Sequence, residues 1–360
     1  MKVVIVGAGV AGLGIGWRLR QAGADVLILE RGQPASAATW AAAGMLAVTG
    51  EMGESQAPES DFARQASGLW PEFATELEST SGLDIGYRRS GTLLVAATPD
   101  EAKAFRPSPD ATVLNAAQTR DLEPMLAPDI AGGLLALGDA QVDNRALGQA
   151  LARAFVSAGG MLSLNEAAVR FVVSGNAVAA AVTPFEHYEA DAFVIAAGAW
   201  SGGFGGLPAE VLPPVHPVKG EMIAVAPPAG AHLPRRLVWG HGIYLVPRPD
   251  RLLIGATVAE TGFDTSLTDE AADWLSRRAV ALMPGLAHWP IVERWAGLRP
   301  GSPDGMPILG HTALGKLFVA TGQYRNGILF APAVADYMSR LVLGRAAPIP
   351  AFDPRRFQDP

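Results

Sequence analysis

The chain has 360 residues, 49% of them hydrophobic and 18% charged, which is typical of a well-buried globular enzyme with one large domain or two interleaved ones. Its net charge of −7, without a long basic run, argues against nucleic acid as a partner. The absence of cysteine excludes disulfides, thiolate nucleophiles and cysteine-bound metals or cofactors, and the six histidines lack a ligand spacing, so we expect no metal site.

Two apolar stretches resemble targeting or membrane segments. Residues 3–13 follow Lys2 as in a signal peptide, but three glycines interrupt them. Residues 192–209 carry no charge, yet they contain five glycines and a proline, which would make a poor membrane-spanning helix. We interpret each stretch as a strand followed by a turn or loop, and we expect a soluble, cytoplasmic protein without a membrane partner.

The most specific motif lies at the N-terminus. Lys2–Val6 is continuously apolar after the lysine and β-branched, as in a buried parallel strand. The glycine-rich run GAGVAG follows and opens a predicted helix that reaches to about Gln21. A second strand is predicted over residues 25–29, with Glu30 at its tip. This order of strand, turn, helix, strand and acid predicts a dinucleotide-binding unit.

Each residue of the motif has a physical role in such a unit. Gly7 permits the tight turn, Gly9 lets a pyrophosphate approach the backbone, and Gly12 lets the helix pack closely on the strand. The helix N-terminus offers free N–H groups and a positive dipole end to the phosphates. Glu30 can accept hydrogen bonds from ribose hydroxyls, and its charge disfavours the 2′-phosphate of NADP. These residues leave NAD and FAD as alternatives.

Two later segments favour FAD. Residues 191–202 read as a buried strand that ends in small residues, where a cofactor can pass close to the backbone. Residues 315–332 read as a strand, a turn at Gly322 and a helix beginning near Gly327. A second helix N-terminus, about 300 residues after the first, suits the flavin end of an extended dinucleotide, which gains negative charge on reduction.

Several further motifs run through the chain: AATWAAAGMLA (37–47), GLDIGYRRSGTLLVA (82–96), PVKGEMI (217–223), GIYLVPRPDRLLIGATV (242–258), WAGLRPGSPDGMPILG (295–310), GQYRNGILFAP (322–332) and FDPRRF (352–357). With the N-terminal fingerprint, they make the sequence resemble the D-amino acid oxidase superfamily, and within it the bacterial glycine oxidases of the thiamine pathway. The resemblance covers nearly the whole chain.

The resemblance implies a mixed α/β (α+β) fold with two interleaved domains. A Rossmann-like FAD-binding domain would comprise residues 1–80, 140–215 and 296–360. A mixed, antiparallel-rich substrate domain would comprise residues 81–139 and 216–295. The resemblance also implies non-covalent FAD, a small amino acid and dioxygen as reaction partners, and it leaves room for a homo-oligomer.

The resemblance assigns roles to individual residues. Arg299 would hold the substrate carboxylate in a two-point fork, Tyr244 would donate its hydroxyl to the same group, and Arg325 would lie beside the substrate and the flavin. Val169 would touch the adenine side. The full set of implied FAD contacts is Gly7, Gly9, Val10, Ala11, Gly12, Glu30, Arg31, Ala38, Thr39, Ala43, Gly44, Met45, Val169, Ala197, Gly198, Gln323, Tyr324, Arg325, Asn326, Gly327, Ile328 and Leu329.

Arg325 lies in a stretch whose other residues favour burial, and no acidic residue lies within ten positions on either side of it. The sequence therefore does not show locally what would neutralise its charge. A buried guanidinium needs a partner. We expect that partner, for Arg325 as for Arg299, to be a substrate carboxylate, which matches a guanidinium in two parallel bonds. The alternatives are ion pairs with distant acids, such as Asp304 for Arg299, and a purely structural role for Tyr244 in the core.

Two positions depart from the pattern of the glycine oxidases. Val258 follows GAT where a methionine is frequent, and Gln323 stands where a histidine or another ring is frequent. Both bear on the preferred substrate more than on the reaction. His241, three residues before Tyr244, is expected at the surface rather than against substrate.

The predicted reaction is oxidative deamination by hydride transfer from the amino acid Cα to flavin N5, which needs positioning rather than a general base. The products would be an oxo acid, ammonia and hydrogen peroxide. Three alternatives stay open at this point: a dehydrogenase that passes electrons to a quinone or a protein, a nicotinamide-dependent enzyme without FAD, and a flavin-binding protein without turnover.

Overall fold

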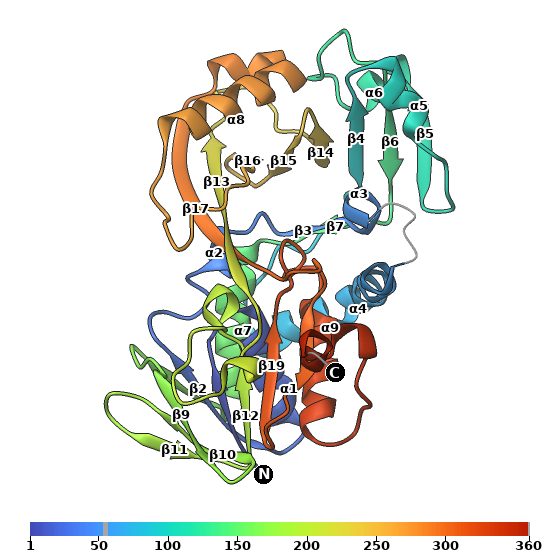
Figure 1. The fold of residues 1–360 in the computed structure, drawn as a ribbon. Helices are drawn as coiled ribbons and strands as arrows, with labels where there is room; N and C mark the ends of the chain where they lie inside the picture. Colours follow the sequence, from blue (N-terminus) through green and yellow to red (C-terminus); the bar gives the residue numbers. More distant parts are fainter. Residues whose placement is uncertain (53–56, 359–360) are drawn as a thin grey trace.

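The computed structural model describes residues 1–52 and 57–358 and has a mixed α/β fold built on two large sheets, one in each lobe (Figure 1). The first thirty residues form β1 (Lys2–Val6), α1 (Val10–Gln21) and β2 (Asp25–Glu30). Residues 3–6 are all buried, because β1 is central in its sheet and covered on both faces. The predicted Rossmann-like unit is therefore confirmed.

The sheet of the lower lobe has six strands in the order β18-β19-β12-β1-β2-β8. The neighbours pair in parallel, except for the antiparallel pair at one edge, β18–β19. The strands outside the N-terminal unit are β8 (Met161–Leu164), β12 (Ala192–Ile195), β18 (Ile308–His311) and β19 (Leu317–Thr321). The carboxyl ends of the parallel strands lie along the same edge of the sheet, and the turn between β1 and α1 lies at this edge.

Alternate side chains of β1 serve two cores. Val3 and Ile5 pack into a core with the helices, whereas Val4 and Val6 pack into a second core on the opposite face. The helical layer consists of α1, α4 (Pro58–Ser81), α7 (Asn144–Ser157) and α9 (Ala331–Val342). The opposite face is covered by a three-stranded antiparallel sheet of β9 (Arg170–Ser174), β10 (Ala177–Val182) and β11 (His187–Glu189).

The upper lobe contains an eight-stranded sheet in the order β17-β13-β16-β15-β14-β4-β6-β5. Its pairs are antiparallel except for β14 and β4. The strands are β4 (Thr92–Ala96), β5 (Ala111–Asn115), β6 (Gly132–Ala136), β13 (His216–Val225), β14 (Leu237–Gly240), β15 (Ile243–Pro247), β16 (Leu252–Gly255) and β17 (Ile291–Gly301). One face packs on α8 (Asp269–Leu282), through an apolar stripe that includes Leu275 and Leu282.

Shorter elements complete the molecule. The two-stranded pair β3 (Met45–Leu46) and β7 (Ala140–Gln141) lies between the lobes, as Figure 1 shows. The short helices are α2 (Ala38–Ala41), α3 (Val48–Met52), α5 (Pro99–Ala104), α6 (Ala116–Leu122) and the 3₁₀ turns η1 (Gly198–Trp200), η2 (Ala209–Val211), η3 (Pro284–His288), η4 (Pro350–Phe352) and η5 (Pro354–Phe357).

The two longest strands, β13 and β17, run side by side from the upper lobe into the lower one (Figure 1). The sequence predicted a domain border between residues 295 and 296, and this position falls inside β17. The segment 192–209 forms β12 followed by loops, which confirms the predicted strand and loop, and it also contains the 3₁₀ turn η1. Over the described ranges, none of the helices combines the length and the apolar character needed to cross a lipid bilayer.

The predicted helix start near Gly327 is wrong. Residues 327–330 form turns, and α9 begins at Ala331 with Phe330 as its N-cap residue. Pro332 explains the shift, because proline lacks an N–H and is tolerated only in the first turn of a helix. A helix that began at Gly327 would have placed this proline in its interior.

Candidate active site

A cavity of about 1050 Å³ is lined by residues of both lobes. The turn between β1 and α1 and the tip of β2 form one part of its wall, and the segment 323–329 forms another. The sheet of the upper lobe contributes residues of β13, β15 and β17. The volume and mostly apolar lining suit a large organic cofactor together with a small substrate.

Glycine is required where the cavity meets α1. Gly7 has a φ of 107°, and a Cβ there would lie 2.5 Å from the carbonyl oxygen of Ala196. A Cβ on Gly12 would lie 1.9 Å from the carbonyl oxygen of Gly7, so this residue lies behind the cavity wall and allows helix and strand to pack. Gly12 was predicted among the cofactor contacts, and the structure instead places it outside the lining. Gly9 faces the cavity, with Thr39 Oγ1 3.5 Å from the position of a Cβ.

Glu30 lies at the cavity wall with its carboxylate held by the backbone. Oε2 accepts a hydrogen bond from the N–H of Ala8 at 2.8 Å, and Oε1 accepts one from the N–H of Gly32 at 2.9 Å. An ionised carboxylate offers about four acceptor positions, so about two remain for hydroxyl groups in the cavity. Glu30 thus both orders the turn after β1 and can bind a ribose.

The wall also carries a buried donor that lacks a partner. Nε2 of Gln323 is buried, and no acceptor for it is found among residues 1–52 and 57–358. Such a donor suits an acceptor on a bound ligand, because an unsatisfied buried amide costs about 1–3 kcal/mol. The small side chains of Ala38, Ala43 and Gly44 leave room for a flat ring system nearby. These features fit an FAD molecule held between the β1–α1 turn and the segment 323–329.

Arg299 enters the cavity from β17 and Tyr244 from β15, and two glycines make room for them. A Cβ on Gly220 would lie within 2.5 Å of the Arg299 guanidinium, and a Cβ on Gly255 would lie within 2.6 Å of the Tyr244 ring and hydroxyl. The motifs PVKGEMI and LLIGATV therefore support these two side chains. Nη1 of Arg299 donates to the carbonyl oxygens of Lys219 and Thr257, both at 3.2 Å.

The ion pair between Arg299 and Asp304 that the sequence left open is not formed. Asp304 instead pairs with Arg356, at 2.8 and 3.0 Å, in the C-terminal segment. Arg299 is half-buried and donates to two backbone carbonyls, while a guanidinium has five N–H donors. It therefore keeps donors that can bind a carboxylate in the cavity.

Arg325 differs from expectation, because it lines the cavity but is exposed rather than buried. Its guanidinium lies 5.8 Å from the ring centre of Tyr324. It also lies near Glu59 of α4: burial raises the pKa of the Glu59 carboxyl, whereas the hydrogen bond from Asn326 and the charge of Arg325 lower it. A protein acid that is remote in sequence therefore contributes to the surroundings of Arg325, which the local sequence did not reveal.

A search of protein families matches residues 2–341 to the family described as DAO, FAD dependent oxidoreductase. The match covers nearly the whole chain. The chain belongs to this family of FAD-dependent oxidoreductases.

Relatives agree with the family. A glycine oxidase of Geobacillus kaustophilus is 37% identical over 94% of this chain and 93% of its own. The bifunctional protein ThiO/ThiG of Synechocystis sp. is 37% identical over 99% of this chain but 54% of its own length. The chain thus spans about half the length of the first curated relatives that it matches. The crystal structure of the Geobacillus kaustophilus glycine oxidase superposes with a TM-score of 0.90 at 35% identity, covering 99% of this chain and 97% of that one.

In this FAD-dependent oxidoreductase, the cavity brings together all the predicted site residues except Gly12. Those on its wall are Gly7, Gly9, Val10, Ala11, Glu30, Arg31, Ala38, Thr39, Ala43, Gly44, Met45, Val169, Ala197, Gly198, Tyr244, Arg299, Gln323, Tyr324, Arg325, Asn326, Gly327, Ile328 and Leu329. His241 lies outside this lining. Their roles toward a ligand remain predictions.

The sequence interpretation missed an aromatic stack at the cavity wall of this oxidoreductase. The guanidinium of Arg31 lies 3.6 Å above the ring of Trp200, and Trp200 stacks on Phe263 with 5.5 Å between ring centres. Trp200 and Phe263 both line the cavity. Trp200 could have been suspected from its place just after a buried strand, whereas Phe263 lies in an exposed loop of the upper lobe and carries no local signal.

Proposed function

We propose that this protein catalyses the FAD-dependent oxidative deamination of glycine, or of small D-amino acids or N-methyl amino acids, with dioxygen as the electron acceptor. The observation that supports this most is that Arg299 and Tyr244 line the same cavity as the glycine-rich turn and Glu30. The names of the relatives that are glycine oxidases support the substrate class.

In the proposed reaction, Arg299 binds the substrate carboxylate by two parallel N–H bonds and Tyr244 donates its hydroxyl to the same group. This anchoring fixes the direction of the Cα–H bond, and positioning supplies most of the acceleration. When bound, FAD supplies the acceptor for the hydride that leaves Cα. The resulting imine reacts with water to give the oxo acid and ammonia, or methylamine where the substrate is an N-methyl amino acid. The two electrons that leave Cα with the hydride, together with two protons, reduce dioxygen to hydrogen peroxide.

An activity assay tests the proposal. Purified protein loaded with FAD is incubated with glycine, sarcosine and several small D-amino acids, and peroxide and ammonia are both measured. We expect equal amounts of the two products from primary amino acids. Turnover with a quinone or an artificial electron acceptor, but without peroxide in air, would instead indicate a dehydrogenase.

Three further points follow the resemblance and belong to the same proposal. We infer cytoplasmic localisation, a place in thiamine biosynthesis, and the division into an FAD-binding domain of residues 1–80, 140–215 and 296–360 and a substrate domain of 81–139 and 216–295. Light scattering of the purified protein measures whether it forms a homo-oligomer.

We expect the protein to purify with FAD that is not covalently attached. The reason is that the chain has no cysteine to form a covalent bond with the flavin. The alternative is a covalent bond through a histidine, and His216 lies on the cavity wall. Acid precipitation should release all the yellow colour into the supernatant. Colour that stays in the pellet, with added flavin mass on the peptide that contains His216, would contradict the expectation.

Replacing Tyr244 with phenylalanine should raise the KM for glycine roughly 5- to 10-fold with little change in kcat, because one hydrogen bond to the carboxylate is lost, worth about 1–1.5 kcal/mol. Steady-state kinetics measure the effect. The matched control is Tyr337→Phe, which removes a hydroxyl that accepts a bond from Ile349 N in the C-terminal region. An unchanged KM in Tyr244→Phe would mean that this hydroxyl does not contact the substrate.

A further inference from the structure

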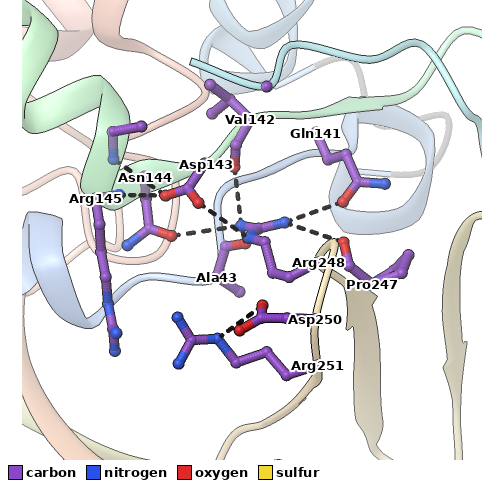
Figure 2. Close-up of polar contacts among 12 residues, drawn as sticks. Ala43, Gln141, Val142, Asp143, Asn144, Arg145, Pro247, Arg248, Asp250 and Arg251 are labelled. Atoms are coloured by element: carbon purple, nitrogen blue, oxygen red, sulfur yellow. Dashed lines mark hydrogen bonds and ion pairs between the residues drawn. The ribbon is translucent and has the colours of Figure 1, made fainter. Parts of the chain in front are cut away.

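Arg248 follows directly after β15 and is among the most buried charged residues of the described chain, at 6% exposure. Figure 2 shows its guanidinium surrounded by oxygen atoms. Nη2 donates to the carbonyl oxygens of Ala43 at 2.7 Å and Val142 at 2.9 Å, and Nη1 donates to Oε1 of Gln141 at 3.1 Å. A longer contact, at 3.4 Å, joins Nη2 to Oδ1 of Asn144.

Acidic groups do little to hold this cation. Oδ2 of Asp143 lies 3.9 Å from Nε of Arg248, and Oδ1 of Asp143 caps α7 by accepting the N–H groups of Arg145 and Ala146. Burial lowers the pKa of Arg248 to about 10, so the side chain still carries its charge at neutral pH. Burying a charge mainly among neutral acceptors is costly, and an apolar side chain could fill the same space at less cost.

The contact with Ala43 has a consequence for the next residue. Gly44 has a φ of 71°, and a Cβ on it would lie 1.9 Å from the carbonyl oxygen of Val142 and 2.8 Å from Nη2 of Arg248. The carbonyl oxygen of Gly44 accepts the N–H of Val142 at 2.8 Å. The backbone around Gly44 is therefore held on one side by Val142 and Arg248.

The same segment also forms part of the cavity wall. The peptide between Ala43 and Gly44 is trans, so the N–H of Gly44 points away from the carbonyl oxygen that Arg248 binds. Ala43, Gly44 and Met45 line the cavity, whereas Arg248 does not. Arg248 also lies four residues after Tyr244, at the end of β15. Its hydrogen bond to Ala43 therefore connects the strand that carries Tyr244 with the segment 43–45.

We propose that Arg248 is a positioning residue that fixes the Ala43–Gly44 peptide with the Gly44 N–H directed at bound FAD. Arg248 itself touches neither cofactor nor substrate. This inference concerns how the protein binds FAD and does not depend on which substrate the protein oxidises. Of the measurements below, only glycine turnover rests on the proposed function.

The test compares Arg248→Lys and Arg248→Met with Arg251→Met. Lysine keeps the charge but has one nitrogen, which cannot serve Ala43, Val142 and Gln141 together. Arg251 is the matched control, because it lies in the same cluster and pairs with Glu293 and Asp250 without contacting the segment 43–45.

Titration of each apo-protein with FAD is the main measurement, followed by the visible spectrum of the bound flavin. In both Arg248 variants we expect roughly tenfold weaker FAD binding and a shifted flavin band, and a kcat for glycine lowered roughly 10- to 100-fold with KM nearly unchanged. Arg251→Met should stay within about twofold of wild type. A purely structural role predicts a lower Tm with unchanged FAD affinity and flavin spectrum, and that result would overturn the proposal.

Hydrogen exchange in the wild-type protein gives an answer even if the variants do not fold. The amide of Gly44 should exchange at least roughly tenfold more slowly with FAD bound than without it, because a donor in a hydrogen bond is protected. Equal exchange in the two states would overturn the proposal. If the Gly44 amide is protected by FAD but glycine is not oxidised, the proposed function fails while the contact between the Gly44 N–H and FAD stands.

Discussion

Replacing Arg299 with alanine should lower kcat/KM for glycine roughly 30- to several-thousandfold while FAD binding stays intact. Arg299 is already held in place by the carbonyl oxygens of Lys219 and Thr257, above the space that Gly220 leaves open. The guanidinium is thus preorganised to receive a carboxylate. Removing one partner of a charge pair costs about 2–5 kcal/mol, which corresponds to this range.

Two comparisons separate a substrate contact from a structural role. Arg294→Ala changes another arginine of β17, which pairs with Asp269 at 2.8 Å, and it should leave kcat/KM within about twofold. Simple amines without a carboxylate should lose far less than glycine does in Arg299→Ala. Equal losses for amines and amino acids would show that Arg299 supports the fold instead of the substrate.

Replacing Glu30 with alanine should weaken FAD binding about a hundredfold. The variant loses the charge-assisted bonds to the ribose, worth on the order of 2–3 kcal/mol, and it leaves the N–H groups of Ala8 and Gly32 without their acceptor. Quenching of flavin fluorescence during titration of the apo-protein measures the affinity. Asp25→Ala is the control, because Asp25 is an exposed acid at the other end of β2.

The thermal unfolding of the apo-proteins completes this experiment. The apo form of Glu30→Ala should still unfold in one transition, at a somewhat lower temperature than wild type, because the N–H groups of Ala8 and Gly32 lose their acceptor. If Glu30→Ala binds FAD as tightly as wild type, Glu30 does not bind the ribose and the N-terminal motif has been misinterpreted.

The N-terminal unit could be predicted almost to the residue, because its causes are local. All the features that predict it lie within the first thirty residues: the apolar run of β1, the glycines at 7, 9 and 12, and Glu30. They also contact one another, as when Glu30 accepts the N–H of Ala8. The start of α9 was missed although its cause is equally local. Proline prefers the first turn of a helix, so Pro332 indicates a helix that begins at about Ala331, not at Gly327.

The remainder of the site depends on contacts that no local pattern encodes. Glu59 comes near Arg325 from α4, and Phe263 reaches Trp200 from a loop of the other lobe. Arg248 could be recognised only as part of a motif, because Ala43, Gln141 and Val142, which accept its shortest hydrogen bonds, lie more than a hundred residues away in sequence. Such residues become recognisable only when folding has brought the segments together.

The paired strands β13 and β17 limit how this protein can open. They are hydrogen-bonded from His216–Gly301 at one end to Val225–Ile291 at the other, and they run through both lobes. A hinge motion of one lobe against the other would have to bend this ladder or break its hydrogen bonds, so we expect the ladder to oppose large movements between the lobes. The turn that carries Phe263 is tied to the same ladder, because the backbone of Ala259 pairs with that of Lys219 in β13 and Nζ of Lys219 donates to the carbonyl oxygen of Ser266. The stack of Phe263 on Trp200 is thus held from β13 on both sides of Phe263.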